Sequence, residues 1–243
     1  SLNGLTFADL PTPVRLSFMK RMLRVTALSD KSDREVRFDL FERLNTGGVA
    51  LSPQEVRSCV YKGKFSVVLD ELAGSPDFKA LIKLQRRRER DGTREEQVLK
   101  FFAYLDYRDE FKGDVKGFLN KCFEKMSNLE DFSRMKEEFS GVIFDLRKVV
   151  DGAFVRPGYA LTPLNQFEAV LVAAAELRRE GEPLAPLTGW LSDRSLVEAS
   201  TGGTNSRSML QRRIGRAREL LRGAVPEPYV QAPDEEAEEE IEG

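Results

Sequence analysis

The segment "TPLNQFEAVLVAAAELRREG", residues 162–181, decides the fold of this 243-residue chain. It is the most apolar of the helical patterns in the sequence, and such a helix is expected to be surrounded by protein. Its longest apolar run, "AVLVAAAEL" from Ala169, is too short to cross a bilayer, so no membrane partner is expected. The segment therefore predicts a central helix in a helical core.

Helical patterns dominate from about residue 65 onward. Two short helices are expected in "FSVVLDELA" and "SPDFKALIKLQ", and a longer one in "RDGTREEQVLKFFAYLDY", where Thr93 and Glu96 predict a capping box. "GDVKGFLNKCFEKMSN", "LEDFSRMKEEFSGVIFDLRKVV", "APLTGWLSD" and "SRSMLQRRIGRARELLRG" complete the array, with Trp190 as a packing anchor. The residues expected in the core are Val98, Leu99, Phe102, Leu105, Phe118, Leu119, Phe123, Phe139, Ile143, Leu146, Met209, Ile214, Leu220 and Leu221.

The content of His and Cys excludes several classes of catalytic and metal site. The chain has no His, which excludes His-based triads, His-dependent nucleases and zincin motifs. Its two cysteines, Cys59 and Cys122, form neither a disulfide framework nor a zinc site by pattern, and they favour a reducing, cytoplasmic compartment. No signal peptide is visible, and because the chain opens with Ser1 and no Met, we expect it to be a piece of a longer protein.

The formal net charge of −2 conceals an asymmetry. The stretch from Pro226 to the end carries eight carboxylates and no base, so the remainder of the chain has an excess of basic residues. Such a proline-punctuated acidic end cannot bury enough apolar surface to fold, and residues 225–243 are predicted to be a disordered tail. The alternative is a tail that mimics DNA and screens a basic face.

The N-terminal part predicts a mixture of elements. A helix is expected from Pro11 or Pro13 to about Lys20, a strand in "MLRVTAL" (22–28), and a helix in "SDKSDREVRFDLFERLN". After the loop "NTGG", Ser52 as N-cap, Pro53 at the first position and Glu55 completing a capping box predict another helix to about residue 61.

The "NTGG" loop has two interpretations. Its glycines leave backbone N–H groups open for a phosphate, Arg43 can add a bidentate contact, and Asn45 can bind a base edge or fix the loop. The dipole of the helix that starts at Pro53 points back toward this loop. The alternative is a simple helix stop with Arg43 on the surface.

"GLTFADLP", "LRVTAL" and "FDLFERLNTGGVALSPQEVRSCVYKGKF" together resemble the GmrSD-type N-terminal domain family, long catalogued as a domain of unknown function with a ParB/sulfiredoxin-like fold. The clear resemblance covers roughly residues 2 to 75. The family's joint pattern is met by Phe41, Arg43, Leu44, Asn45, Gly47, Gly48, Leu51, Gln54, Glu55 and Arg57.

The resemblance implies a role in DNA-modification-dependent restriction and anti-phage defence, with nucleoside-triphosphate hydrolysis. The nucleotide would be contacted by Arg43, Asn45, Gly47, Gly48, Gln54 and Arg57. The family's upstream Asp-Gly-Gln-Gln-Arg motif is absent, and "RDGTREEQ" is not a substitute for it. This chain therefore looks like the C-terminal part, which holds half of an NTP and Mg²⁺ site, needs the upstream half as a partner and is expected to be inactive alone.

Two basic clusters are candidates for DNA binding through phosphate contacts, without base specificity. The first lies in "KLQRRRERDGTR", for which the alternative is a solvated helix end; the second lies on the last helix, after a loop (201–206) that can bind an anion or supply Ser206 or Ser208 as an N-cap. Neither interleaves aromatic residues, which argues against stacking on single strands. The candidate residues are Arg86, Arg87, Arg88, Arg90, Arg207, Arg212, Arg213 and Arg216.

Carboxylates make no convincing pair. Asp106, Asp109 and Glu110 in "LDYRDE" can bind Mg²⁺ in principle, but their spacing favours a solvated helix end.

The sequence thus predicts a mainly α fold: a helical domain (63–224) preceded by the last strand and helices of a truncated ParB-like α+β nucleotide-binding domain (1–62). The expected function is one wall of a nucleotide site with a helical DNA-binding or relay domain. The alternative is a non-enzymatic protein-interaction scaffold.

Overall fold

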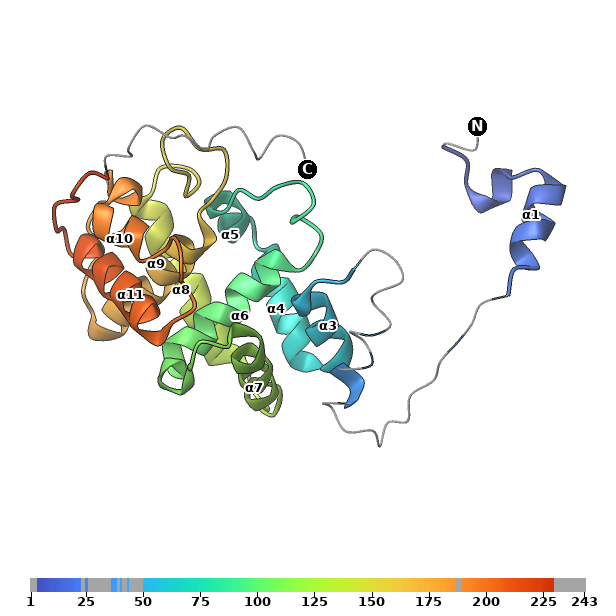
Figure 1. Cartoon of the computed structure of the whole chain (residues 1–243), viewed down its shortest axis with the longest axis horizontal. Coiled ribbons are helices and arrows are strands. Elements are labelled where there is room, and N and C mark those ends of the chain that lie inside the picture. The colour runs from blue at the N-terminus through green and yellow to red at the C-terminus, as the bar shows by residue number, and fades with distance from the viewer. Residues whose placement is uncertain are drawn as a thin grey trace.

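The computed structural model describes residues 4–22, 25, 36–38, 40, 43, 50–186 and 189–229 (Figure 1). Within these residues the regular structure is helical, apart from an isolated bridge between Asp193 and Pro228. The mainly α prediction is confirmed. The preceding α+β part is not shown: of the predicted strand 22–28 only Met22 and Val25 are described, both with irregular backbone, and the remainder lies outside the described residues.

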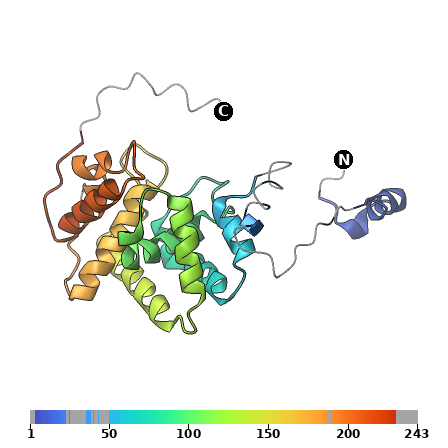
Figure 2. The same cartoon turned by 60° about the horizontal axis from the view of Figure 1, so that its bottom comes forward.

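Helix α9 (Leu164–Glu180) is the central element, as predicted from its hydropathy. Residues 166–175 are all buried, and the helix ends at Gly181, whose φ of 75° suits glycine. It packs against α6 (Thr93–Asp106), α8 (Ser133–Val149) and α11 (Arg207–Leu221). Figure 2 shows α9 crossing the body between these helices.

Helix α6 forms the second centre of the core. It is contacted by α3 (Pro53–Val60), α4 (Lys64–Gly74) and α7 (Val115–Ser127), while α5 (Pro76–Leu81) joins α4 to α8. One continuous cluster of buried side chains runs from Val56 on α3 to Leu221 on α11. The domain boundary predicted at residue 62 therefore falls inside a shared core, to which α3 belongs.

The predicted core residues are buried, except that Met209 is half-buried. Aromatic rings fill the centre: Phe139 lies 5.2 Å from Phe101 and 5.3 Å from Phe78 between ring centroids. Trp190, at the start of the 3-10 helix η4 (Trp190–Ser192), packs edge-on against Phe154.

The capping predictions have opposite outcomes. At α3, Ser52 accepts from the Glu55 N–H at 3.1 Å and Glu55 accepts from the Ser52 N–H at 2.7 Å, as predicted. At α6 the predicted box is wrong, because the N-cap is Gly92 and the Glu96 side chain is bound to an arginine of α3. Gly92 has a φ of 78°, and a Cβ there would lie 3.0 Å from Gln54 Cγ, so glycine lets the start of α6 approach α3.

The first two elements of the chain stand apart from the core in Figure 1, whereas the described residues from 36 onward reach it. Helix α1 (Thr12–Met19) begins where the prolines predict. Neither this helix nor the 3-10 turn η1 (Phe7–Asp9) before it has a buried residue. Residues 36–38, Leu40 and Arg43 are helical, in agreement with the predicted helix there. Phe38 packs its ring 5.4 Å from that of Tyr61.

A C-terminal strap (224–229) follows α11 and returns to α10 (Arg194–Glu198). Glu227 accepts from the Arg194 N–H at 2.7 Å, and the Tyr229 N–H donates to Ser192 at the same distance. The fully buried Asp193 accepts from the N–H of Glu227 and from the Arg216 guanidinium. Hydrogen bonds thus hold Glu227 and Tyr229, within the predicted tail, to the chain around α10, and residues 230–243 of that tail lie outside the described residues.

Among the described helices, none combines the length and apolarity that a bilayer crossing requires.

Replacing Phe139 by Ala should lower the free energy of unfolding by about 3–5 kcal/mol, because it leaves a cavity among packed rings. The matched control is Phe144→Ala on the same helix, where the ring is 59% exposed and the loss should stay below about 1 kcal/mol. Urea unfolding measures both, and equal losses would contradict the assigned core.

Acid should weaken the attachment at Asp193. Burial alone would raise the pKa of this carboxyl, but the bonds from Arg216 and from the Leu196 and Glu227 N–H groups outweigh it and lower the pKa. A lowered folded-state pKa gives stability that is present above the ordinary value of 3.8 and is lost as pH falls through the folded value. The stability advantage of the wild type over Asp193→Asn in urea unfolding should therefore shrink from about pH 7 to about pH 3. A stability difference between the two proteins that does not change with pH would refute this assignment of Asp193.

Candidate functional site

The arginine turn, residues 86–90, lies between α5 and α6. The sequence predicted a helix through Gln85, but α5 ends at Leu81 and the chain continues in irregular backbone. Two loops hold it there: the Lys83 N–H donates to Thr162 Oγ1 at 2.8 Å, and the Thr162 N–H donates back to the Lys83 carbonyl at 3.0 Å. At the other end Ser52 Oγ donates to the Asp91 carbonyl at 2.5 Å. The arginines therefore sit on a fixed turn.

The charge of this turn is not compensated locally. Its acidic residue, Glu89, pairs with Arg94 at 3.0 Å. The other four side chains are exposed and have no ion pair or side-chain hydrogen bond to any residue that the structure describes. These four are Arg86, Arg87, Arg88 and Arg90.

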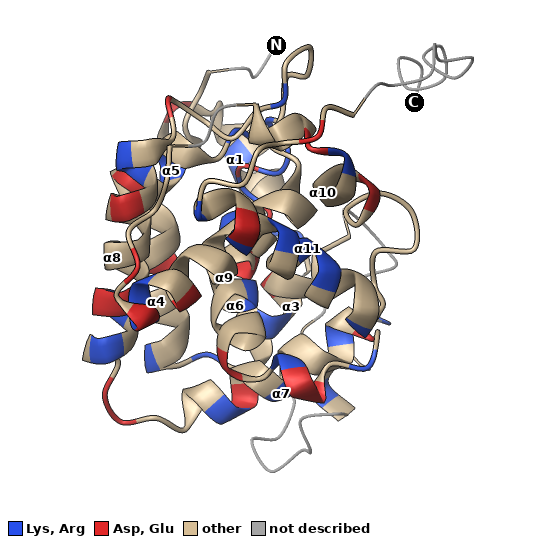
Figure 3. Ribbon diagram, turned by 90° about the vertical axis from the view of Figure 1, so that its left-hand side faces the viewer, with Lys and Arg blue, Asp and Glu red and all other residues tan. Residues whose placement is uncertain are grey.

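The arginines of α11 have a different environment. Figure 3 shows acidic and basic segments next to one another over α9, α10 and α11. Arg207 pairs with Asp109 at 2.6 Å, Arg212 with Glu198 at 2.9 Å, and Arg216 with Asp193 at 2.7 Å. The predicted N-cap Ser206 accepts from the Met209 N–H at 3.2 Å. Opposite charges already occupy these guanidinium groups.

Arg213 requires a correction. Its side chain is only 3% exposed and binds Glu168 at 2.6 Å, with a second bond to the Thr204 carbonyl at 2.8 Å. The prediction that Arg213 contacts DNA does not fit this structure, because the helical spacing places it on the inner face of α11.

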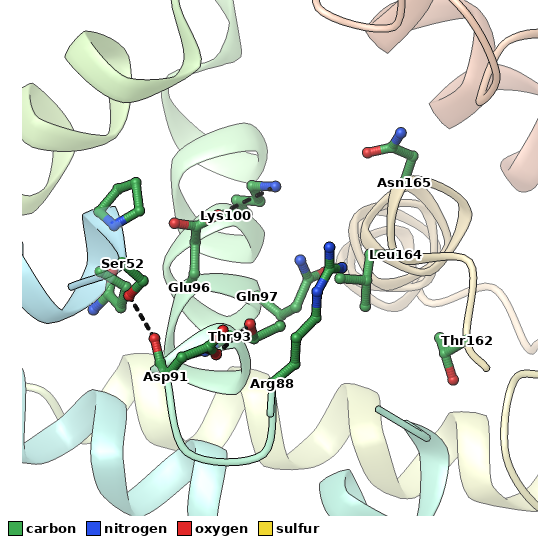
Figure 4. Close-up of a pocket in the computed structure, with 12 residues that line it drawn as sticks. Ser52, Arg88, Asp91, Thr93, Glu96, Gln97, Lys100, Thr162, Leu164 and Asn165 are labelled. Carbon is green, nitrogen blue, oxygen red and sulfur yellow. Dashed lines mark hydrogen bonds and ion pairs between the residues drawn. The ribbon is translucent and has the colours of Figure 1, made fainter. Parts of the chain in front are cut away.

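A polar cleft of about 500 Å³ adjoins the turn (Figure 4). Three helices begin around it, since residues from the first turns of α3, α6 and α9 line it. The N-cap residues of α6 and α9, Gly92 and Pro163, supply no capping side chain, and at α6 the Asp91 carboxylate accepts from the Thr93 N–H at 3.0 Å instead. The polar lining includes Ser52, Arg88, Asp91, Gln97, Lys100 and Asn165.

Two further hollows share walls with this cleft. One, of about 670 Å³, lies under the arginine turn and shares Ser52, Arg88 and Asp91 with it. The other, of about 260 Å³, shares Leu164 and other residues at the start of α9. Arg88 therefore lines both the cleft and the hollow under the turn.

Of the six predicted nucleotide-binding residues, the structure describes Arg43, Gln54 and Arg57. Gln54 lines the cleft, but its Oε1 accepts from Arg57 Nε at 2.9 Å. Arg57 is 1% exposed and pairs with Glu96, so it stabilises the core and does not face a ligand. Arg43 is exposed. Asn45, Gly47 and Gly48 lie outside the described residues.

Sequence analysis missed a row of alternating charges that crosses the core from α3 to α11. Arg57 pairs with Glu96, Lys100 Nζ lies 3.5 Å from Glu96 and 3.3 Å from Glu168, and Glu168 binds Arg213. The contact between Lys100 and Glu168 Oε2 is an ion pair without the alignment of a hydrogen bond. The local signal was Glu168 at the start of the apolar run of the most apolar helix, because a buried carboxylate there needs cations beside it.

Burial and neighbouring charges shift the pKa of Lys100, Arg57 and Tyr104 in and beside this row. Burial alone would lower the pKa of Lys100, but the carboxylates of Glu168 and Glu96 outweigh it and raise the pKa. Burial lowers the pKa of Arg57, and Glu96 opposes that shift. Burial and the nearby Glu168 also raise the pKa of Tyr104, which therefore stays neutral.

The carboxylates considered for Mg²⁺ point to separate partners. Asp106 binds Arg179 at 2.9 Å, Asp109 binds Arg207, and Glu110, on the 3-10 turn η3 (Arg108–Glu110), binds Lys125 at 2.6 Å. No metal-binding group of His, Cys, Asp and Glu occurs in the described ranges.

Comparison with known proteins finds no matching family model, no matching curated protein and no matching solved structure.

Replacing Glu168 by Gln should lower the free energy of unfolding by about 3–5 kcal/mol, because Arg213 then keeps a buried charge without a counterion. The control is Glu198→Gln, which removes the exposed pair with Arg212 and should cost less than about 1 kcal/mol. Urea unfolding compares the two. Similar small losses would mean that the row of charges contributes little to stability.

Proposed function

We propose that this chain is part of a GmrSD-like restriction protein of anti-phage defence, and that its helical region binds the phosphate backbone of DNA through the arginine turn. The observation that carries the proposal is the contrast between the two basic clusters. The turn's four exposed arginines have no partner among the described residues, whereas the arginines of α11 are held by carboxylates.

The proposal follows from the energetics of phosphate binding. Each cation that neutralises a phosphate releases a condensed counterion, and that release drives binding at low salt. An arginine already paired with a carboxylate must first lose that pair, so it gains less. Four arginines on one short turn can follow a phosphate backbone without reading its bases.

The family resemblance supports a second component. The nucleotide site would be completed by the upstream half of the protein, with Arg43, Asn45, Gly47 and Gly48 forming the wall that this chain supplies. NTP and Mg²⁺ would bind only in that complete protein, which would be cytoplasmic. Gln54 and Arg57 would support this wall from α3, because their side chains bind each other.

The alternative function is a protein-interaction scaffold. It is favoured by exposed apolar side chains on two helices in contact, Val67 on α4 (64% exposed) and Phe144 on α8 (59% exposed). In that case the arginine turn would serve only solubility.

Duplex DNA titrations discriminate the two functions. The triple variant Arg86→Ala, Arg87→Ala, Arg90→Ala should bind duplex DNA roughly tenfold more weakly or worse at low salt. The slope of the logarithm of its binding constant against the logarithm of the salt concentration should become less steep by about 0.9 for each lost phosphate contact. Fluorescence anisotropy with one labelled duplex at two or more salt concentrations measures both quantities.

The matched control, Arg207→Ala, Arg212→Ala, Arg222→Ala, removes the same charge from paired positions and should change the affinity much less. Equal losses in both variants would show that only net charge matters. Little binding by the wild type at any salt concentration would favour the scaffold.

A further inference from the structure

The polar cleft beside the arginine turn contains an unused hydrogen-bonding group. Gln97 lines this cleft from α6 and is 1% exposed, yet its Oε1 has no hydrogen-bond partner among the described residues. A buried amide oxygen without a partner costs free energy, so a ligand that satisfies it gains affinity.

The two sides of the cleft differ in charge. In Figure 4 Arg88 extends toward Leu164 at the start of α9, where the uncapped helix N-terminus favours an anion, and Gln97 lies between Leu164 and Glu96. On the opposite side, Ser52, Asp91 and Glu96 lie near the start of α3. Asp91 uses one carboxylate oxygen to accept from Thr93 at 3.0 Å. An anion therefore fits the α9 side, and a hydrogen-bond donor fits the α3 side.

We propose that this cleft binds one nucleotide unit, with its phosphate at Arg88 and the start of α9 and its base against Gln97, toward Asp91. A nucleotide is anionic at one end and, in adenine, cytosine and guanine, carries an exocyclic amine at the other. Glutamine amides and carboxylates are the usual acceptors of such amines. The volume of about 500 Å³ lies within the range of small-molecule sites.

The unit has two possible sources, a free nucleoside monophosphate or the phosphorylated end of a strand. The second source rests on the proposed function, because Arg88 belongs to the turn that would hold the adjoining backbone. Both place the same phosphate and base in the cleft.

The test is calorimetric titration of the chain with adenosine monophosphate, thymidine monophosphate, inorganic phosphate and a 5′-phosphorylated single-stranded oligonucleotide. Adenosine monophosphate should bind more tightly than phosphate or thymidine monophosphate, because only its amine reaches an acceptor. Binding of the oligonucleotide without binding of the free nucleotide would identify a strand end as the ligand.

Three variants make the test specific. Gln97→Met should lower the affinity for adenosine monophosphate or for the strand end at least tenfold, and it should leave the binding of inorganic phosphate and of duplex DNA unchanged. Its thermal stability should not fall, since Gln97 Oε1 has no partner to lose. Arg88→Ala should weaken every phosphorylated ligand, and Arg86→Ala, on the same turn but outside the cleft lining, should leave free-nucleotide binding intact.

The inference fails if the wild type binds neither the nucleotide nor the strand end at millimolar concentration, or if Gln97→Met binds them as tightly. Duplex binding that depends on the arginine turn would survive either result. Conversely, a wild type that binds the nucleotide but does not bind duplex DNA would refute the proposed function and leave the cleft as a nucleotide site.

Discussion

The buried carboxylate of Glu168 is the constraint on which the helical core depends. It lies in the second turn of α9, between Phe167 and Ala169, which are apolar and fully buried. An unpaired charge in such surroundings is too costly to keep, so cations must be brought in from other helices. Lys100 from α6 and Arg213 from α11 meet that need, and their positions fix how α6 and α11 pack on α9.

The same requirement shapes the cleft. Lys100 carries the row of charges to Glu96, and Glu96 in turn holds Arg57 of α3. Because Glu96 is committed to these cations, it cannot cap its own helix. The start of α6 is left to Gly92 and Asp91, which turn the chain and present the arginines. The arrangement of the surface thus follows from the ion pairs beneath it.

Local signals in the sequence predicted the features that depend on one segment. The hydropathy of 162–181 located the central helix, and Ser52 with Glu55 located the start of α3, since both signals are complete within a few residues. The capping box at Thr93 and Glu96 has the same local signal and was wrong, because Arg57, far away in sequence, competes for Glu96. The end of α5 was also misplaced, since hydrogen bonds from Thr162 hold the following residues out of the helix.

The arginines show most clearly what sequence cannot decide. Both basic clusters are rich in arginine, and the sequence predicted DNA binding for each of them for that reason. Their difference lies in the supply of nearby carboxylates: Asp109, Glu168, Asp193 and Glu198 come to α11 from other parts of the chain, and no such group reaches the turn from the described residues. The four like charges of the turn repel one another. They also do not contribute to the stability of the core, whose ion pairs centre on Glu168. A ligand that brings negative charge to the turn removes the repulsion, which is why the uncompensated cluster on the turn, and not the cluster on α11, is the better candidate for binding phosphate.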